Sequence, residues 1–362
     1  MKRRKFIAAA GLAAAGAAIA RPAVAQAAPA VTWRLASSFP TNFDAIWSGA
    51  RVLAEAVRQR SDGRFVIETH APGEIAGAIE VLDAVGEGRA ECGHTALNYF
   101  WGKEPALVFA TGAPFGMNAR EQNAFFRAGG GTELINEILA DHKVVALPSG
   151  NTGCQMGGWF RAEIKSSADL RGMKFRVSGF AAKILRTLGV EPKAMGRGEI
   201  AAALGSGALD AAAWVSPADD EKLDLAKVAP NYYYPGWLQP NMAIHLVVNS
   251  AKWNELPKAY QEILRSAADT ANAETQAKYD AANPAALRRL AEGGAKLRAF
   301  PPEVLESFWQ ATGAVMRETA AGDAKFRRLH DAYMEFRNDQ YLWWQVAEYP
   351  FDNFMIRQRA RG

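Results

Sequence analysis

The chain has 362 residues, more than one ordinary hydrophobic core organises, so its length predicts two lobes. The formal net charge is +4, and five positive charges lie in the first 21 residues, so subtracting those five leaves −1 for the remainder. The chain after residue 21 has no basic surplus, and we therefore expect no nucleic-acid partner.

Residues 1–26, MKRRKFIAAAGLAAAGAAIARPAVAQ, have the pattern of an export signal: a basic start, an apolar middle of small residues and an AVA cleavage motif. The Arg3-Arg4 pair followed by KFI favours twin-arginine export, with ordinary secretion as the alternative. The apolar run is too short and too rich in glycine to span a bilayer stably. We expect cleavage and a mature protein in the periplasm.

Strands and helices are predicted to alternate along the mature chain. An apolar-polar alternation or a short apolar run indicates a strand, and apolar residues every three to four positions indicate a helix. The predicted strands cover residues 31–40, 64–73, 90–102, 143–153, 172–179 and 241–250, and the predicted helices cover 45–63, 79–90, 180–189 and about 257–290. Such alternation predicts an α/β fold with parallel strands covered by helices, with ligands bound at the carboxyl ends of the strands.

The C-terminal segment 341–356, YLWWQVAEYPFDNFMI, is dense in aromatic residues. Pro350 is expected to break or bend it. One interpretation is a helix that closes the core of one lobe. The alternative is a subunit contact, which would make the protein a homodimer, because a terminal helix exchanges easily between protomers.

The two cysteines and a search for the common catalytic motifs give little evidence of catalysis. Cys92 and Cys154 could form a bridge in an oxidising compartment, but a chain of this size needs none, and two buried free thiols are favoured. The sequence contains no HExxH, CxxC, GxSxG, P-loop or GxGxxG motif.

Five segments, VTWRLASSFP, GGWFR, GMKFRVSGFAAKIL, WVSPADDEKL and NYYYPGW, resemble the extracytoplasmic solute receptors of TRAP transporters, and most of all their subgroup that binds small 2-oxo acids such as pyruvate. The resemblance implies a two-lobed α/β clam of the periplasmic-binding-protein type, with strands crossing between the lobes and a long bridging helix. It also implies a small carboxylate ligand, delivery to membrane permease subunits, and no catalysis. We expect lobe I in 27–150, lobe II in 151–240, the return strand and bridging helix in 241–290, and C-terminal helices that close lobe II in 291–362.

The resemblance also implies the residues of the site. Arg176 in KFRV matches the arginine that pairs with the ligand carboxylate, a task suited to the planar guanidinium because it forms two parallel hydrogen bonds. Gln155 lies in the glycine-rich segment GNTGCQMGGWFR, which matches the crossover between the lobes, whereas Trp159 and Phe160 are expected in the core. The other candidate ligand-binding residues are Asn151, Trp214, Gln239, Tyr99 and Phe100, of which the last two have lobe core as the alternative.

One departure from the subgroup bears on a bound cation. The subgroup has a glutamate where this chain has Ala213, and a second acidic residue where it has Gln239. Without the glutamate, an arginine, a monocarboxylate and a monovalent cation leave one buried positive charge uncompensated, which costs several kcal/mol. We therefore expect no cofactor and disfavour a bridging cation. A dianionic ligand could restore the balance around a cation. Asp219 or Asp220 could also do so, but their sequence is typical of the acidic first turn of a helix.

Two alternatives of other classes stay open at this point. The first is an exported enzyme with a cofactor, against which the missing cofactor motifs argue. The second is a binding protein that presents its ligand to a membrane receptor rather than to a permease.

Overall fold

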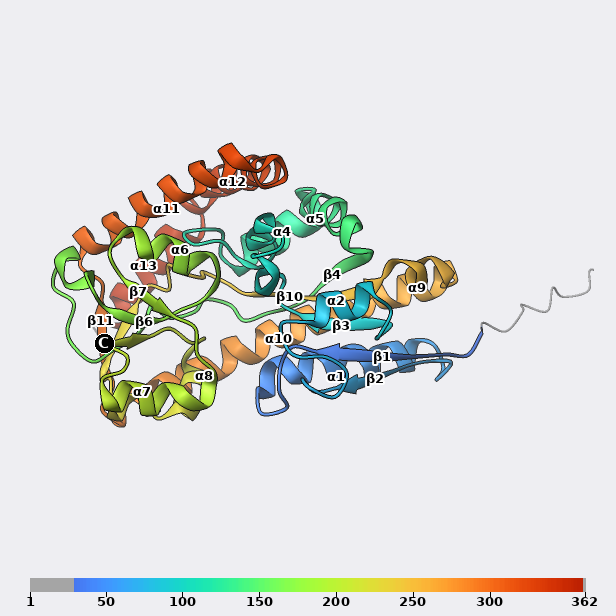
Figure 1. Ribbon diagram of the computed structural model, residues 1–362, viewed down its shortest axis with the longest axis horizontal. Helices are drawn as coiled ribbons and strands as arrows, with labels where there is room; N and C mark the ends of the chain where they lie inside the picture. The colour runs from blue at the N-terminus through green and yellow to red at the C-terminus, as the bar shows by residue number, and fades with distance from the viewer. Residues whose placement is uncertain (1–28, 361–362) are drawn as a thin grey trace, which may run out of the picture.

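The computed structural model describes residues 29–360 and places them around two β-sheets, which lie side by side along the long axis of the molecule (Figure 1). Each sheet has its own covering helices, so the predicted two-lobed α/β fold is confirmed. The predicted export signal lies outside the described residues. Within the described part of the chain, no helix is both long enough and apolar enough to cross a membrane.

The sheet of lobe I has five strands in the order β2-β1-β3-β10-β4. Strands β1, β2 and β3 are parallel, whereas β10 is antiparallel to both of its neighbours. The strands are β1 (Val31–Ser37), β2 (Phe65–His70), β3 (Cys92–Thr95), β4 (Val144–Asn151) and β10 (Ala243–Asn249). The helices of this lobe are α1 (Asp44–Arg60), α2 (Val81–Gly86), α3 (Val108–Thr111), α4 (Ala119–Ala128), α5 (Gly131–Leu139) and α9 (Ser250–Glu255).

The sheet of lobe II has six short strands in the order β11-β9-β5-β8-β6-β7. They are β5 (Gly158–Phe160), β6 (Lys174–Arg176), β7 (Glu191–Lys193), β8 (Ala211–Ala212), β9 (Asn231–Tyr234) and β11 (Lys296–Ala299). The helices are α6 (Gly179–Thr187), α7 (Ile200–Ser206) and α8 (Pro217–Asp220). Trp159 and Phe160 are fully buried in this lobe, as expected, and Trp159 stacks on Tyr232 with ring centroids 3.9 Å apart.

Two crossover segments join the lobes, one between β4 and β5 and one between β9 and β10. They touch each other: the Thr152 amide donates to the Met242 carbonyl at 3.1 Å. A Cβ atom at Gly236 would lie only 1.9 Å from the carbonyl oxygen of Gln155. The crossovers therefore approach as closely as backbones can, which requires glycine at this position.

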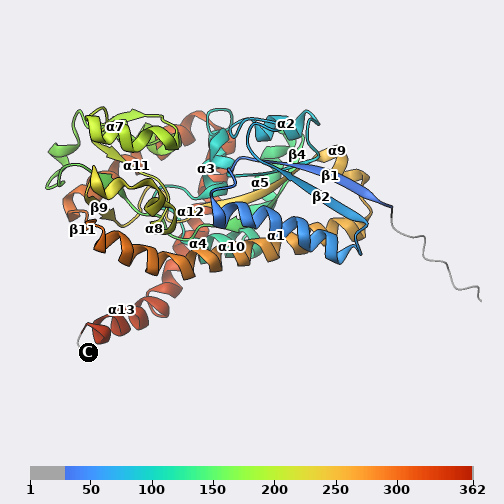
Figure 2. The same cartoon turned by 90° about the horizontal axis from the view of Figure 1, so that it is seen from below.

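Helix α10 (Lys258–Glu292) is the long bridging helix, with 35 residues. It runs beneath both lobes (Figure 2) and packs on α1 and β4 of lobe I and on α8 of lobe II. Its N-terminal half places Tyr260 and Leu264 in the core of lobe I, and Leu290 near its C-terminal end joins the core of lobe II. One rigid element thus links the two cores.

Three helices complete the chain: α11 (Pro302–Gly322), α12 (Ala324–Trp344) and α13 (Glu348–Arg359). Helix α11 packs on α6 of lobe II, but α12 packs on α3, α4 and α5 of lobe I. The C-terminal helices therefore cover both lobes rather than lobe II alone.

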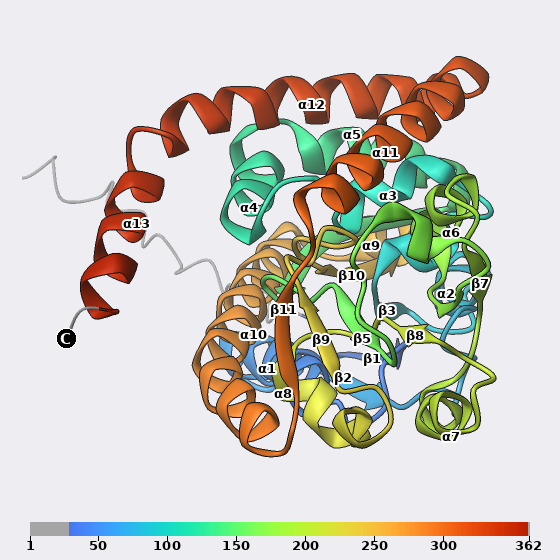
Figure 3. The same ribbon diagram turned by 90° about the vertical axis from the view of Figure 1, so that its left-hand side faces the viewer.

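Helix α13 projects away from both lobes and has no buried residue (Figure 3). The interpretation that the aromatic tail closes a core is therefore wrong for α13. The chain bends at residues 345–347, before Pro350, which lies in the first turn of α13. Proline is tolerated there because the first-turn amides have no partner within the helix.

The two cysteines are both free. Cys92 is buried in β3, as expected of a structural thiol, but Cys154 in the first crossover is exposed. The expectation of two buried thiols is thus half right.

Candidate functional site

Arg176 ends strand β6, at the carboxyl edge of the lobe II sheet. Its Nη1 donates to the carbonyl of Ala213 at 2.8 Å, and its Nε donates to the carbonyl of Met195 at 3.3 Å. Nη2 makes no hydrogen bond within the described part of the chain. The two carbonyls hold the guanidinium in place and leave one nitrogen for another acceptor.

The surroundings of Arg176 are largely desolvated. The indole ring of Trp214 faces the guanidinium, with Cζ 4.7 Å from the ring centroid. Desolvation lowers the pKa of Arg176, while Tyr99 and then Asp220 favour its charged form. A partly buried and desolvated guanidinium of this kind attracts a carboxylate strongly.

The site lies where the lobes meet. Phe43, just before α1 of lobe I, packs on Trp214 of lobe II with ring centroids 5.6 Å apart. Beside this contact, Lys222 of lobe II forms an ion pair with Asp44 of lobe I at 2.9 Å. Val215 shares a hydrophobic cluster with Phe43 and with Tyr279 of the bridging helix. Contacts from both lobes thus enclose the loop that follows β8.

Several polar groups around this junction have no partner. Gln155 is only 6% exposed, yet its side-chain amide makes no hydrogen bond within residues 29–360. Trp214 Nε1, Gln239 Nε2 and Ser216 Oγ are buried without a partner in the same range. Buried polar groups are normally paired, so these groups are candidates for hydrogen bonds to a ligand.

Asn151 behaves differently from the other expected site residues. Its Oδ1 accepts from the Gly153 amide at 2.9 Å, and its Nδ2 donates to Asn241 Oδ1 at 3.0 Å. Asn241 in turn donates to the carbonyl of Met117 at 2.8 Å. Both ends of the Asn151 amide are committed to the protein, so this residue joins the crossovers instead of presenting a free group to a ligand.

Tyr99 and Phe100 lie in the turn after β3 but point to different places. Tyr99 is 39% exposed, although enough protein surrounds its phenol that desolvation raises its pKa to about 12. It interacts electrostatically with Arg176. Phe100, expected at the ligand, is buried in the hydrophobic core with Leu97 and Phe180. Only Tyr99 remains a candidate for the site.

The acidic pair lies in the first turn of α8, as expected, but both side chains are buried and hydrogen-bonded. Asp219 is buried and accepts from Tyr279 of α10 at 2.5 Å. Asp220 is also buried and accepts from Trp159 Nε1 at 2.9 Å and from Tyr232 at 2.7 Å. The sequence reasoning missed these roles because they depend on tertiary packing: Trp159 lies 61 residues before Asp220 in the chain, and Tyr279 lies 60 residues after Asp219.

The bridging cation implied by the resemblance can be tested against these residues. Hard cations take carboxylate and carbonyl oxygens. Here Ala213 has no carboxylate, its carbonyl already accepts from Arg176, and both oxygens of Asp220 already accept hydrogen bonds from other groups. Within residues 29–360, no group of three or more His, Cys, Asp or Glu side chains could hold a metal. The residues present do not fit a carboxylate-based cation site.

The net charge is a weaker argument against the cation than the sequence suggested. Asp220 supplies a negative charge that favours the charged form of Arg176. An arginine, this aspartate, a monocarboxylate and a monovalent cation would sum to zero. The missing carboxylate ligands, rather than the charge count, now argue against a cation.

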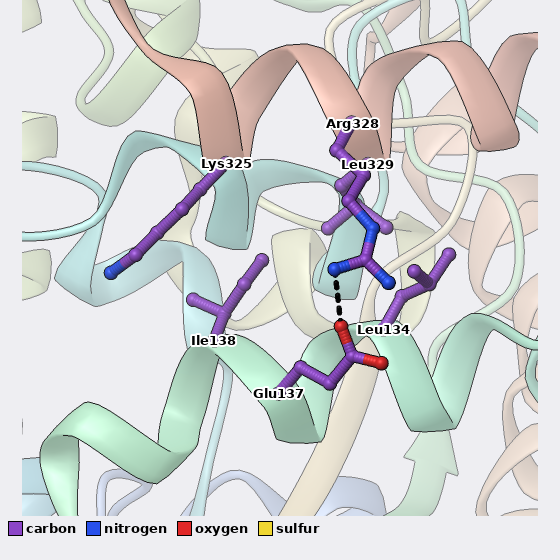
Figure 4. Close-up of a pocket in the computed structure, with 6 residues that line it drawn as sticks. All are labelled: Leu134, Glu137, Ile138, Lys325, Arg328 and Leu329. Carbon is purple, nitrogen blue, oxygen red and sulfur yellow. Dashed lines mark ion pairs between the residues drawn. The ribbon is translucent and has the colours of Figure 1, made fainter.

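A concavity of about 240 Å³ lies away from Arg176, between α5 and α12 (Figure 4). It is lined by Leu134, Glu137, Ile138, Lys325, Arg328 and Leu329. Arg328 and Glu137 point toward each other and form an ion pair, and Lys325 pairs with Glu104 and Asp141. Its cations already have carboxylate partners, unlike Arg176 at the lobe junction.

The two-lobed architecture, with a partly buried arginine where the lobes meet, is that of a solute-binding protein, and comparison with known proteins agrees. The chain belongs to family 7 of the bacterial extracellular solute-binding proteins, the DctP family, which it matches over residues 37–323. It is 43% identical over 326 residues to a monocarboxylate 2-oxoacid-binding periplasmic protein of Nostoc sp., covering 90% of this chain and 89% of the relative.

Solved structures of TRAP transporter solute-binding proteins give the same result. One from Bordetella bronchiseptica is 40% identical, with a TM-score of 0.88 over 92% of this chain and 99% of its own; it is described as a mixed-occupancy dimer with copurified calcium and picolinate. One from Colwellia psychrerythraea with calcium and pyruvate is 33% identical, with a TM-score of 0.86 over 89% of this chain and 99% of its own. The family and these relatives are solute-binding proteins of transporters rather than enzymes.

Proposed function

We propose that this protein is the extracytoplasmic receptor of a TRAP transporter and captures a small organic monocarboxylate, a 2-oxo or 2-hydroxy acid, between its lobes. The observation that carries the proposal is Arg176, a desolvated cation held by two carbonyls with Nη2 uncommitted. The ligand carboxylate pairs with this guanidinium, and Gln155, Trp214 and Gln239 donate to its remaining oxygens. The relatives named above, which bind 2-oxo acids or pyruvate, support the ligand class.

In this proposal, the protein captures its ligand so that a membrane permease can transport it. The protein is exported to the periplasm by the signal in residues 1–26 and delivers its ligand to membrane permease subunits. Membership of the family supports this role.

Binding in this proposal needs no bridging cation. Relatives from Colwellia psychrerythraea and Pseudoalteromonas atlantica are described with calcium or sodium beside pyruvate. This chain has Ala213 and Gln239 where the resemblance places acids, and Asp220, the carboxylate that acts electrostatically on Arg176, already accepts hydrogen bonds at both oxygens. The pairing of arginine and carboxylate therefore holds the ligand with neutral donors alone.

A calorimetric titration tests the proposal. Mature protein, freed of copurified ligand by unfolding and refolding, is titrated with 2-oxo and 2-hydroxy monocarboxylates, with and without chelator and sodium. We expect binding that survives both treatments. In Arg176→Lys the affinity should fall about 10- to 100-fold, because lysine cannot make the paired hydrogen bonds. Arg171→Lys, an exposed arginine of the same lobe, is the matched control.

Each outcome is informative. Equal affinity in Arg176→Lys would refute the role of the arginine. Binding that requires added sodium or calcium would refute cation independence but leave the receptor function intact. No binding of any monocarboxylate would refute the ligand class.

We further propose that the protein is a homodimer through its C-terminal helices. Large apolar side chains are exposed at the end of α12 and along α13: Tyr341, Leu342, Trp343, Val346, Tyr349, Phe351, Phe354, Met355 and Ile356. A surface of this kind is typical of an interface. Ultracentrifugation of the full mature chain should show a dimer, and a chain ending at residue 346 should be monomeric; a monomeric full-length protein would refute the proposal.

A further inference from the structure

Asp220 is a buried carboxylate to which the proposed binding reaction assigns no direct role. It is 1% exposed and accepts three hydrogen bonds. Trp159 Nε1 and the Tyr232 hydroxyl both donate to Oδ2, at 2.9 Å and 2.7 Å, and the backbone amide of Val215 donates to Oδ1 at 3.0 Å. One oxygen therefore faces the sheet of lobe II and the other faces the loop after β8.

The two side chains that donate to Oδ2, those of Trp159 and Tyr232, form a rigid part of the lobe II sheet. Trp159 and Tyr232 occupy neighbouring strands in register, their rings are stacked, and neither is exposed. Side chains packed in this way have no alternative rotamer without opening a cavity. Oδ2 of Asp220 is thus anchored to two fully buried, stacked side chains of the lobe II core.

On the other side, Oδ1 of Asp220 contacts the loop 213–215, which surrounds the guanidinium of Arg176. Val215 directly follows Ala213 and Trp214, and these two residues contact Arg176 from two directions. The Ala213 carbonyl accepts from Nη1, and the Trp214 ring covers the guanidinium. Any shift of the loop would turn the guanidinium that the ligand must meet.

We propose that Asp220 is a positioning residue: it ties the loop 213–215 to the sheet so that Arg176 is pre-oriented for the ligand carboxylate. The proposal rests on the proposed function, since it concerns how the same arginine binds. Pre-orientation matters because the entropy of ordering the guanidinium is then not lost on binding.

Asparagine cannot replace Asp220 in this arrangement. The indole and the backbone amide are donors only, and they approach different oxygens of the carboxylate. An asparagine offers one oxygen, so one of these two donors must face its NH₂ group. Asp220→Asn should therefore release the loop or strain it, and we expect monocarboxylate affinity to fall roughly tenfold.

Asp219 provides a matched control on the same short helix. It is also buried, but it accepts from Tyr279 of α10 and makes no hydrogen bond to residues 213–215. Asp219→Asn should lower the unfolding temperature while leaving the affinity within about twofold, because the loop keeps its anchor.

The experiment is a double-mutant cycle read by calorimetric titration with the monocarboxylate that the wild-type protein binds most tightly. Affinity is measured for wild type, Asp220→Asn, Arg176→Lys and the double variant, with thermal unfolding of each in parallel. If Asp220 acts through Arg176, its substitution should cost much less affinity in the Arg176→Lys background. A defect of stability alone would not show this coupling.

The outcomes separate the two proposals. Failure of wild type to bind any monocarboxylate refutes the proposed function. If wild type binds and folded Asp220→Asn binds with the same affinity, the positioning role is overturned. It is also overturned if Asp219→Asn loses as much affinity as Asp220→Asn. A third refuting result is that the affinity losses of Asp220→Asn and Arg176→Lys simply add in the double variant. If Asp220→Asn does not fold, Tyr232→Phe removes one donor to Oδ2 and keeps the ring; it should weaken binding about threefold, and unchanged affinity would overturn the proposal.

Discussion

Asp220 should make the stability of this protein fall as the pH rises toward neutrality. Burial raises the pKa of this carboxyl from 3.8 to about 6, although its hydrogen bonds from Tyr232, Trp159 and Val215 act in the opposite direction. The folded protein therefore holds a proton at Asp220 at pH values where the unfolded chain has lost it. The contribution is fully present below pH 3.8 and is lost as the pH rises through about 6.

The magnitude follows from the difference in pKa. About two units at 1.36 kcal/mol each correspond to a contribution on the order of 3 kcal/mol. Asp220→Asn removes the titration, so the free energy of unfolding of wild type relative to this variant should be about 3 kcal/mol larger near pH 4 than near pH 7.5.

Urea denaturation of both proteins across this range is the assay. Asp169→Asn is a control of opposite sign, because hydrogen bonds from the Lys165 and Ser166 amides lower the pKa of Asp169. Its contribution should appear as the pH rises through the acid range. A difference between wild type and Asp220→Asn that stays constant with pH would refute the reasoning, since it would mean that Asp220 has the same pKa in both states.

Two further substitutions probe the junction of the lobes. Gly236→Ala places a methyl group 1.9 Å from the carbonyl oxygen of Gln155, so chemical denaturation should show a loss of about 1–3 kcal/mol in the free energy of unfolding. Gly102→Ala is the control, because its methyl group meets nothing within 4 Å and should leave the stability nearly unchanged. Asp44→Asn breaks the inter-lobe ion pair with Lys222. Because Asp44 is 78% exposed, ligand affinity should fall less than about threefold at low salt and should not change at high salt. A loss of affinity that does not depend on salt would contradict this view.

Local pattern was enough to predict most elements of the fold. The amphipathic spacing at 45–63 and the Ala-, Gln- and Glu-rich stretch at 257–290 correspond to α1 and α10 within a few residues. The apolar runs at 143–153 and 241–250 correspond to β4 and β10. These elements follow from the periodicity of side chains along one segment, which a sequence displays directly.

Contacts between distant segments were harder to foresee. Asn151 looked like a ligand-binding amide, but Asn241, 90 residues away, occupies one end of it. Asp220 was correctly expected in the first turn of a helix, but the sequence did not show that Trp159, 61 residues earlier, donates to its carboxylate. In both cases the residue type is compatible with two environments, and only the partner brought by folding selects one of them.

The C-terminal tail shows the same limit. Its aromatic residues predict burial, yet α13 buries none of them against its own chain. Hydrophobicity specifies that a surface should be covered but not by which molecule.

The sequence by itself determined the α/β class, the succession of strands and helices and, through the resemblance, the family and the arginine proposed for its site, because these depend on residues close together in the chain. Only the tertiary structure decided that two carbonyls hold Arg176, that Asn151 joins the crossovers and that Asp220 ties the loop to the sheet. Those outcomes depend on which side chains meet across the packed lobes, and a pattern along one segment carries no information about its partner.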